Sequence, residues 1–124
     1  MTTNGPPKKK VLVIEDNPGI LFALKEALEM DGYEVEASAE FGGVHKISKS
    51  PPHLIFLDIF LATQDGREVT RDLKGHAGTK HIPVVILSAY PGIEKLAEEA
   101  GADGYLAKPF DLDALFAVTK KHTA

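Results

Sequence analysis

The strongest constraint on the fold of this chain is a repeated alternation between short apolar runs and amphipathic stretches. Three runs are almost wholly apolar, namely 11–14, 54–57 and 83–87. Runs of this length and composition are typical of strands that are buried on both faces of a sheet. Two weaker segments, 33–37 and 104–107, complete a set of five predicted strands.

A predicted helix follows each of these strands. Asn17 and Pro18 are residue types that favour the N-cap and the first helical position, and this helix ends at the Asp31–Gly32 pair. The other predicted helices cover 39–49, which Gly42 and Gly43 weaken, 66 to about 74, 93–100, and a last segment capped by Asp111. Five alternating strand–helix units predict a three-layer α/β fold, with a parallel sheet covered by helices on both faces.

Length and composition narrow the class of protein. The 124 residues suit one domain, which we expect over 9–124, after a flexible polar tail over 1–8. The absence of cysteine excludes disulfides and thiolate metal sites, and the net charge of −4 argues against direct nucleic-acid binding. No apolar run reaches the ~20 residues of a membrane span and the first residues do not form a secretory signal, so we expect a cytoplasmic protein.

Polar residues stand where the predicted strands end. Glu15 and Asp16 follow the first strand, Asp58 follows the third, Ser88 the fourth and Lys108 the fifth. The carboxyl ends of parallel strands form the ligand crevice of an open α/β sheet, so these side chains should meet. Clustered carboxylates favour Mg²⁺, a lysine and a hydroxyl suit a phosphoryl group, and an aspartate can itself be the phosphorylated nucleophile.

These motifs, taken in order, resemble the receiver domain of two-component response regulators. The resemblance rests on 11–17, 54–58, 65–66, 84–89 and 101–110 and extends over about 9–122. It implies a doubly wound (βα)5 flavodoxin-like fold with strand order 2-1-3-4-5. It also implies Mg²⁺-dependent phosphotransfer onto Asp58 from a histidine kinase or a histidine phosphotransfer protein.

The resemblance also implies a metal site. Asp16 and Asp58 would bind Mg²⁺ directly, with the backbone carbonyl of Phe60 as a third ligand and Glu15 acting through water. Mn²⁺ is an alternative ion. None of the five histidines is expected to bind the metal or to donate phosphate, because they fall on predicted surface segments or strand entries (His45, His53, His76, His81 and His122).

The same resemblance assigns a switch. Lys108 would pair with the phosphoryl group, and its peptide bond to Pro109 would be cis. Ser88 would move to a phosphoryl oxygen and Tyr105 would follow it inward, although a fixed core aromatic is an alternative for Tyr105. The expected output surface combines the fourth helix, fifth strand and fifth helix (Ile93, Leu96, Tyr105 and Phe116). The pattern of the last helix also favours a core position for Phe110, Leu112, Leu115 and Phe116.

Two features set this chain apart from the usual receiver pattern. Ala62 replaces the proline that usually stands four residues after the phosphoacceptor, which puts the rigidity of that loop in question. The resemblance also implies that Phe60 and Tyr90 would flank the path of the water that hydrolyses the acyl phosphate. Because neither offers a carboxylate or an amide to orient water, we expect a long-lived phosphorylated form. Tyr90 is also compatible with a plain exposed loop aromatic.

The sequence fits other functions less well than a signalling switch. A haloacid-dehalogenase-type phosphatase needs an acid where Phe60 stands, a flavodoxin needs a phosphate loop where Glu15 and Asp16 stand, and no P-loop motif for an NTPase occurs. A pseudo-receiver that works without phosphorylation stays as the alternative. We expect no conventional turnover enzyme. The predicted partners are the phosphodonor and a downstream protein or output domain, with no direct contact to nucleic acid or membrane, and the chain is expected to be a monomer or a weak phosphorylation-dependent dimer.

Overall fold

A computed structural model describes residues 8–124 of the chain. The tail predicted over 1–8 therefore lies, apart from Lys8, outside the described residues. The strands are β1 (Lys10–Ile14), β2 (Glu34–Ser38), β3 (Leu54–Asp58), β4 (Val84–Ser88) and β5 (Gly104–Ala107). The helices are α1 (Pro18–Met30), α2 (Val44–Lys49), α3 (Gly66–Gly75), α4 (Ile93–Ala100) and α5 (Leu112–Thr123).

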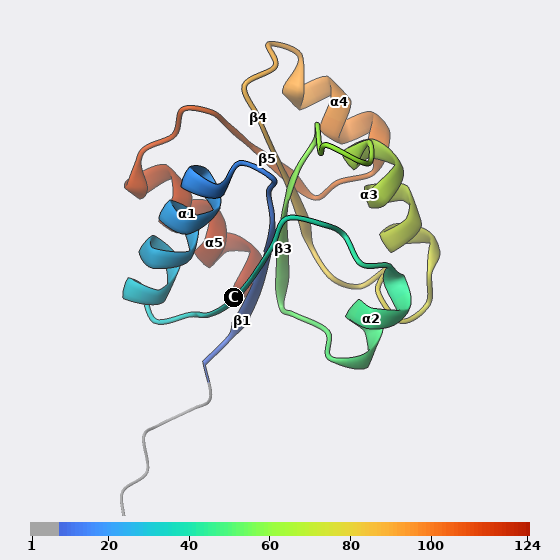
Figure 1. Ribbon diagram of the computed structural model, residues 1–124, viewed down its shortest axis with the longest axis horizontal. Coiled ribbons are helices and arrows are strands. Elements are labelled where there is room, and N and C mark those ends of the chain that lie inside the picture. Colours follow the sequence, from blue (N-terminus) through green and yellow to red (C-terminus); the bar gives the residue numbers. More distant parts are fainter. Residues whose placement is uncertain (1–7) are drawn as a thin grey trace, which may run out of the picture.

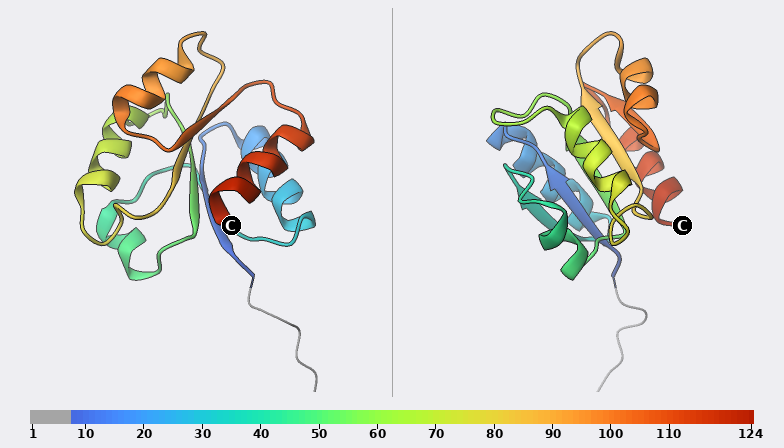
Figure 2. Two further views of the ribbon diagram at one scale, coloured as in Figure 1. Left: turned by 180° about the vertical axis from the view of Figure 1, so that it is seen from behind. Right: turned by 90° about the vertical axis from the view of Figure 1, so that its right-hand side faces the viewer.

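The strands form one parallel sheet in the order β2-β1-β3-β4-β5, which confirms the predicted α/β class and topology. Figures 1 and 2 show three layers, with α1 and α5 on one face of the sheet and α2, α3 and α4 on the other. Each face has its own apolar core, because the central strands send alternate side chains to opposite sides. The central strands β1, β3 and β4 are almost wholly buried, whereas β2 at the edge alternates between exposed and half-buried residues.

Side chains predicted to cap helices do so. The Asn17 side chain accepts a hydrogen bond from the Ile20 N–H at 3.0 Å, and the Asp111 side chain accepts from the Ala114 N–H at 2.8 Å. Each of these contacts satisfies a backbone donor that the first turn of a helix leaves free. Among residues 8–124 no helix combines the length and apolar character that crossing a membrane requires.

The predicted start of the second helix is wrong. The helix begins at Val44 and not at Ala39, because Gly42 and Gly43 have φ angles of 79° and 96°. These left-handed values interrupt a right-handed helix. Phe41 precedes them and turns into the core instead, where it is buried against the α2–α3 face of the sheet.

Two expectations about apolar residues at the last two helices, for Leu112 and Ile93, also need correction. Leu112 is 55% exposed and lies at the first position of α5, so it is not a core residue. Phe110 and Phe116 are partly buried and pack against the edge of the core on this face, and Leu115 is fully buried as predicted. Ile93, the first residue of α4, is buried against the sheet side of this helix. It therefore supports the expected output surface from beneath and does not form part of it.

Candidate functional site

The register of the sheet brings the predicted functional side chains to one edge. Ile14 pairs with Leu57, Asp58 with Leu87 and Ser88 with Ala107. Residues that directly follow Ile14 and Ala107 therefore stand beside the ends of β3 and β4. This is the upper edge of the sheet in Figure 1, between the ends of α1 and the β4–α4 connection.

Three carboxylates gather at this edge. One side-chain oxygen from each of Glu15, Asp16 and Asp58 lies within 4.8 Å of the others. Glu15 and Asp58 are buried, with exposed fractions of 1% and 7%, while Asp16 is half-buried. Like charges this close in a partly dehydrated site raise one another's free energy.

Lys108 provides the compensating charge within the part of the chain that the structure describes. Its Nζ lies 2.6 Å from a carboxylate oxygen of Glu15 and 3.7 Å from Oδ1 of Asp58. The backbone N–H of Lys108 donates to the Ser88 carbonyl at 2.9 Å, which continues the β4–β5 pairing up to the site. The Lys108–Pro109 peptide bond is cis, in agreement with the expectation from the sequence.

Asp58 is the least well compensated of the buried carboxylates. Burial, followed by the negative charge of Glu15, raises the pKa of Asp58 from 3.8 to about 6. Lys108 and the Phe60 N–H, which donates to Oδ1 of Asp58 at 3.3 Å, act in the opposite direction. Glu15 has better partners, because its carboxylate also accepts from the Asn17 N–H at 3.1 Å.

The chemistry of this donor set fits a hard divalent cation. Carboxylate oxygens are the ligands that Mg²⁺ prefers, and three carboxylates against one ammonium leave an excess of negative charge. A cation would relieve the repulsion that raises the pKa of Asp58. The carboxylates of Glu15, Asp16 and Asp58 are thus the residues that could hold it, and the Phe60 carbonyl stays a predicted ligand.

Ser88 ends β4 beside this cluster and is 3% exposed. Its hydroxyl oxygen accepts from the Tyr90 N–H at 2.9 Å, which leaves the hydroxyl hydrogen to rotate toward a ligand. Tyr105, on β5, is 40% exposed. The alternative of a fixed core aromatic is therefore wrong for Tyr105 in this conformation.

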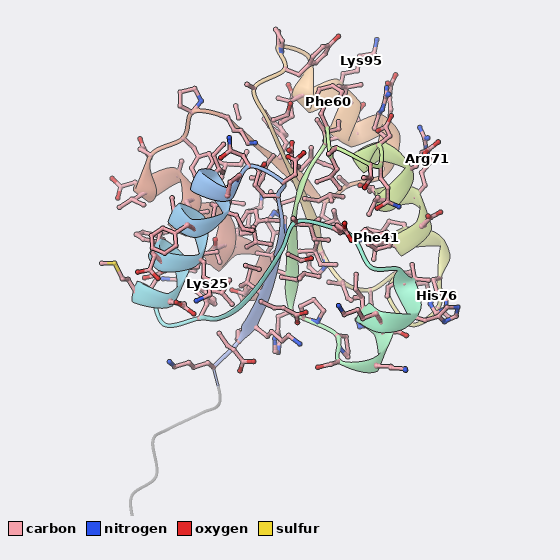
Figure 3. The ribbon with its side chains drawn as sticks, viewed as in Figure 1. Lys25, Phe41, Phe60, Arg71, His76 and Lys95 are labelled. Atoms are coloured by element: carbon pink, nitrogen blue, oxygen red, sulfur yellow. The ribbon has the colours of Figure 1, made fainter. Side chains whose placement is uncertain are left out.

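Two aromatic side chains contact each other at the mouth of the site. Phe60 and Tyr90 are about half exposed, and their rings meet edge to face with centroids 6.0 Å apart. Figure 3 places Phe60 at the carboxyl end of the sheet, above the strand ends. The sequence identified both residues, but their pairing depends on the neighbouring positions of β3 and β4 and has no local sequence signal.

The loop after Asp58 lacks the usual proline, and backbone contacts between its two ends close it instead. The Gly66 N–H donates to the Ile59 carbonyl at 2.7 Å, and Phe60 forms a bridge with Asp65. A Cβ at Gly66 would lie 2.6 Å from Cα of Ile59, so only glycine fits this approach. The exposed Ala62 takes no part in this closure. Residues 65–66 belong to the motifs that carry the resemblance, but the sequence alone does not reveal this packing role of Gly66.

Asp65 reinforces the same closure. Its side chain caps α3 by accepting from the Arg67 N–H at 2.8 Å, and the Arg67 guanidinium pairs with it at 2.6 Å. The hydrogen bonds from Arg67 lower the pKa of Asp65. Asp65 is thus a structural carboxylate, distinct in partners from the three that gather around Asp58.

Comparison with known proteins assigns this arrangement to a family. A family model described as the response regulator receiver domain matches residues 11–120. The sporulation initiation phosphotransferase F of Bacillus subtilis is 31% identical over 117 residues, covering 92% of this chain and 93% of that protein. The transcriptional regulator RpaA of Synechocystis is 35% identical over 111 residues, covering 87% of this chain and 46% of that protein.

The chain thus spans about half the length of several curated relatives, RpaA among them. A solved structure gives a direct fold comparison. The receiver domain of the sensor histidine kinase PA1611 from Pseudomonas aeruginosa superimposes with a TM-score of 0.85 at 26% identity, over 94% of this chain and 98% of that one. That structure has a magnesium ion coordinated in its active-site cleft.

Proposed function

The chain belongs to the response regulator receiver family of two-component systems, and on this premise we propose that it is a signalling switch controlled by phosphorylation of Asp58. The observation that carries the proposal is that a buried carboxylate, an ammonium and a hydroxyl lie together at Asp58. A buried carboxylate with a raised pKa stands at a strand end, with Lys108 Nζ at 3.7 Å and the hydroxyl of Ser88 on the neighbouring strand.

The proposed reaction is phosphoryl transfer from a phosphohistidine of a histidine kinase or a phosphotransfer protein. A carboxylate oxygen of Asp58 attacks phosphorus, so that a P–O bond forms while the P–N bond to the donor imidazole breaks. The imidazole leaves with the electron pair of that bond and is neutral when its other nitrogen carries a proton. Asp58 becomes an acyl phosphate.

Two side chains would bind the oxygens of the phosphoryl group once it is attached to Asp58. The ammonium of Lys108 would form ion pairs with both Glu15 and the new phosphoryl oxygens. The Ser88 hydroxyl would donate a hydrogen bond to one of the phosphoryl oxygens. Mg²⁺, or Mn²⁺ in its place, bound by Asp16, Asp58 and the Phe60 carbonyl with Glu15 acting through water, would supply further neutralisation of the negative charge.

The proposed output follows from the place of Ser88. Its movement toward the phosphoryl group leaves space behind it, into which the exposed Tyr105 can turn. That change would remodel the surface formed by α4, β5 and α5, including the half-buried Leu96 and Phe116. A downstream protein or an output domain would read this surface, and a weak phosphorylation-dependent dimer is compatible with it. The chain would act in the cytoplasm, without contacting nucleic acid or membrane itself.

Mass spectrometry of the intact protein tests the proposal. Incubation with acetyl phosphate and millimolar Mg²⁺ should add the mass of one phosphoryl group, and omission of Mg²⁺ should greatly reduce the modified fraction. Asp58→Asn should stay unmodified, while Glu99→Gln, which removes an exposed carboxylate from α4, should react as the parent does. A parent that gains no mass under these conditions would favour the pseudo-receiver alternative and contradict the proposal.

A further inference from the structure

Helix α2 depends on the rest of the protein for its stability. It has six residues, whereas isolated helices shorter than ~12 residues are marginal in water. Its N-cap, Gly43, makes no side-chain hydrogen bond to the first turn, and Ile47 is its one buried residue. Few apolar contacts therefore fix α2 to the sheet, so contacts at its outer side have a large relative weight.

The turn between α3 and β4 supplies such contacts. The rings of His45 on α2 and His76 in this turn meet edge to face, with centroids 5.2 Å apart and planes at 88°. A Cβ at Gly78 would lie 2.8 Å from Cβ of Ser48, so the backbone of the turn packs directly against α2. Figure 3 shows His76 at the outer end of α3, beside α2.

His76 also holds the turn together. Its Nδ1 accepts a hydrogen bond from the Gly78 N–H at 3.0 Å. Its carbonyl accepts from the N–H groups of Thr79 and Lys80, at 3.0 and 2.8 Å. A ring nitrogen that accepts a hydrogen bond has a free lone pair, so this geometry requires a neutral imidazole with its proton on Nε2.

Few charged groups face the two rings. Arg71 and Asp72 of α3 line the same hollow as His45 and His76, and both are exposed, so their effects on a charge at His76 are largely screened. The ammonium of Lys74 is engaged elsewhere, 2.6 Å from Asp103. The Lys46 side chain of α2 lies near Gly42, just before the helix, and it is exposed like Lys49 of α2 and Lys80 of the turn, so the charges of all three are largely screened. The hydrogen bond to Gly78 is therefore the contact most sensitive to the charge of His76.

We propose that the contacts of His45 and Ser48 with His76 and Gly78 form an acid-sensitive latch for α2, which opens when His76 takes up a proton at Nδ1. A protonated imidazole is a donor at both nitrogens, so Nδ1–H would face the Gly78 N–H, donor against donor. The ring must then turn away, which also removes its contact with His45. The latch shares no residue with the site around Asp58.

Amide hydrogen exchange across the range in which imidazoles titrate, from about pH 8 to about pH 5, tests the latch. Corrected for intrinsic exchange rates, the protection of the Gly78, Ile47 and Ser50 amides should fall about five- to tenfold at the acid end, the equivalent of one hydrogen bond. His81→Gln, which removes an exposed histidine before β4, should behave as the parent does.

His76→Asn is the decisive variant. Its Oδ1 occupies the same place along the side chain as Nδ1 and can accept from the N–H two residues ahead, as in an Asx turn, but it does not titrate. Protection in this variant should stay unchanged between the two pH values. Equal protection of the parent at both pH values, or an equal loss in parent and variant, would overturn the proposal. If the variant fails to fold, the parent alone decides: the Gly78 amide resonance must shift with the same midpoint as the His76 ring, and separate midpoints refute the latch.

Discussion

Replacing Asp58 by asparagine should stabilise the metal-free protein at neutral pH. The pKa of Asp58 rises from 3.8 to about 6, and a difference of one in pKa corresponds to about 1.4 kcal/mol. Ionised Asp58 therefore costs at most about 3 kcal/mol of folding free energy. Asparagine keeps an oxygen for the Phe60 N–H but gives up the attraction of Lys108, so we expect a gain of about 1–3 kcal/mol, or several degrees in melting temperature.

The sign of this effect depends on pH. A carboxyl group whose pKa is raised by folding contributes its stabilising, protonated form below the unfolded pKa, and this contribution is lost as pH rises through the folded pKa. The advantage of Asp58→Asn over the parent should thus be small at about pH 4, grow up to about pH 6 and stay constant above that value. Binding of Mg²⁺ should stabilise the parent more than the variant, because asparagine replaces one of the carboxylates proposed to bind the ion. A ligand at 100 times its Kd adds about 2.7 kcal/mol to the free energy of unfolding.

Urea unfolding in EDTA at a series of pH values measures this difference directly. Glu99→Gln has the same change in net charge at an exposed position and serves as the control, which should show no comparable gain. A metal-free Asp58→Asn protein that is no more stable than the parent at about pH 7.5 would refute the reasoning. So would a melting temperature of the parent that millimolar Mg²⁺ leaves unchanged.

Three further predictions concern the surroundings of Asp58. Gly66→Ala should destabilise the fold by about 1–3 kcal/mol in urea unfolding, because its Cβ would lie 2.6 Å from backbone, whereas Gly75→Ala in the same helix has open space and should be neutral or stabilising. The double variant Phe60→Asn with Tyr90→Glu should lose phosphate about 10- to 100-fold faster than the parent without a phosphatase, since it introduces groups that orient water. An unchanged decay rate would show that these side chains do not set the lifetime of the acyl phosphate. Ser88→Ala should still accept phosphate but lose most of the amide shifts that beryllofluoride induces on β5 and α4, and shifts equal to those of the parent would contradict the proposed switch.

The sequence was sufficient to predict the sheet because the strands carry unambiguous local patterns. The runs that became β1, β3 and β4 are apolar on both faces, and strand ends marked by Asp58 and Ser88 agree with the structure within one residue. The start of α2 was predicted wrongly because periodicity does not reveal which glycines adopt a left-handed φ. The exposure of Leu112 could not be predicted for a related reason. Apolar spacing shows which face of a helix a residue lies on, but it does not show whether that residue lies over the sheet or beyond its edge.

The candidate site was predictable as a set of residues but not as a pattern of contacts. Parallel strands place their carboxyl ends together, so the gathering of Glu15, Asp16 and Asp58 follows from topology. The preference of Lys108 for Glu15 over Asp58, and the edge-to-face pairing of Phe60 with Tyr90, depend on side-chain directions that no spacing in the sequence encodes.

This preference supports the proposal that Asp58, and not Glu15, is the buried carboxylate that accepts the phosphoryl group. Glu15 is matched by an ammonium at 2.6 Å and a backbone N–H at 3.1 Å. Asp58 shares the same ammonium only at 3.7 Å, and its negative charge stays under-compensated. Phosphorylation would turn this carboxylate into an acyl phosphate, a mixed anhydride whose acyl oxygens carry no full charge. The phosphoryl oxygens would carry about −1.5 to −2, and the Ser88 hydroxyl, Lys108 and a bound cation would compensate that charge. The chemistry proposed for Asp58 would thus take the charge off a carboxylate that Lys108 compensates only at 3.7 Å and place it on oxygens that a cation, Lys108 and Ser88 can share.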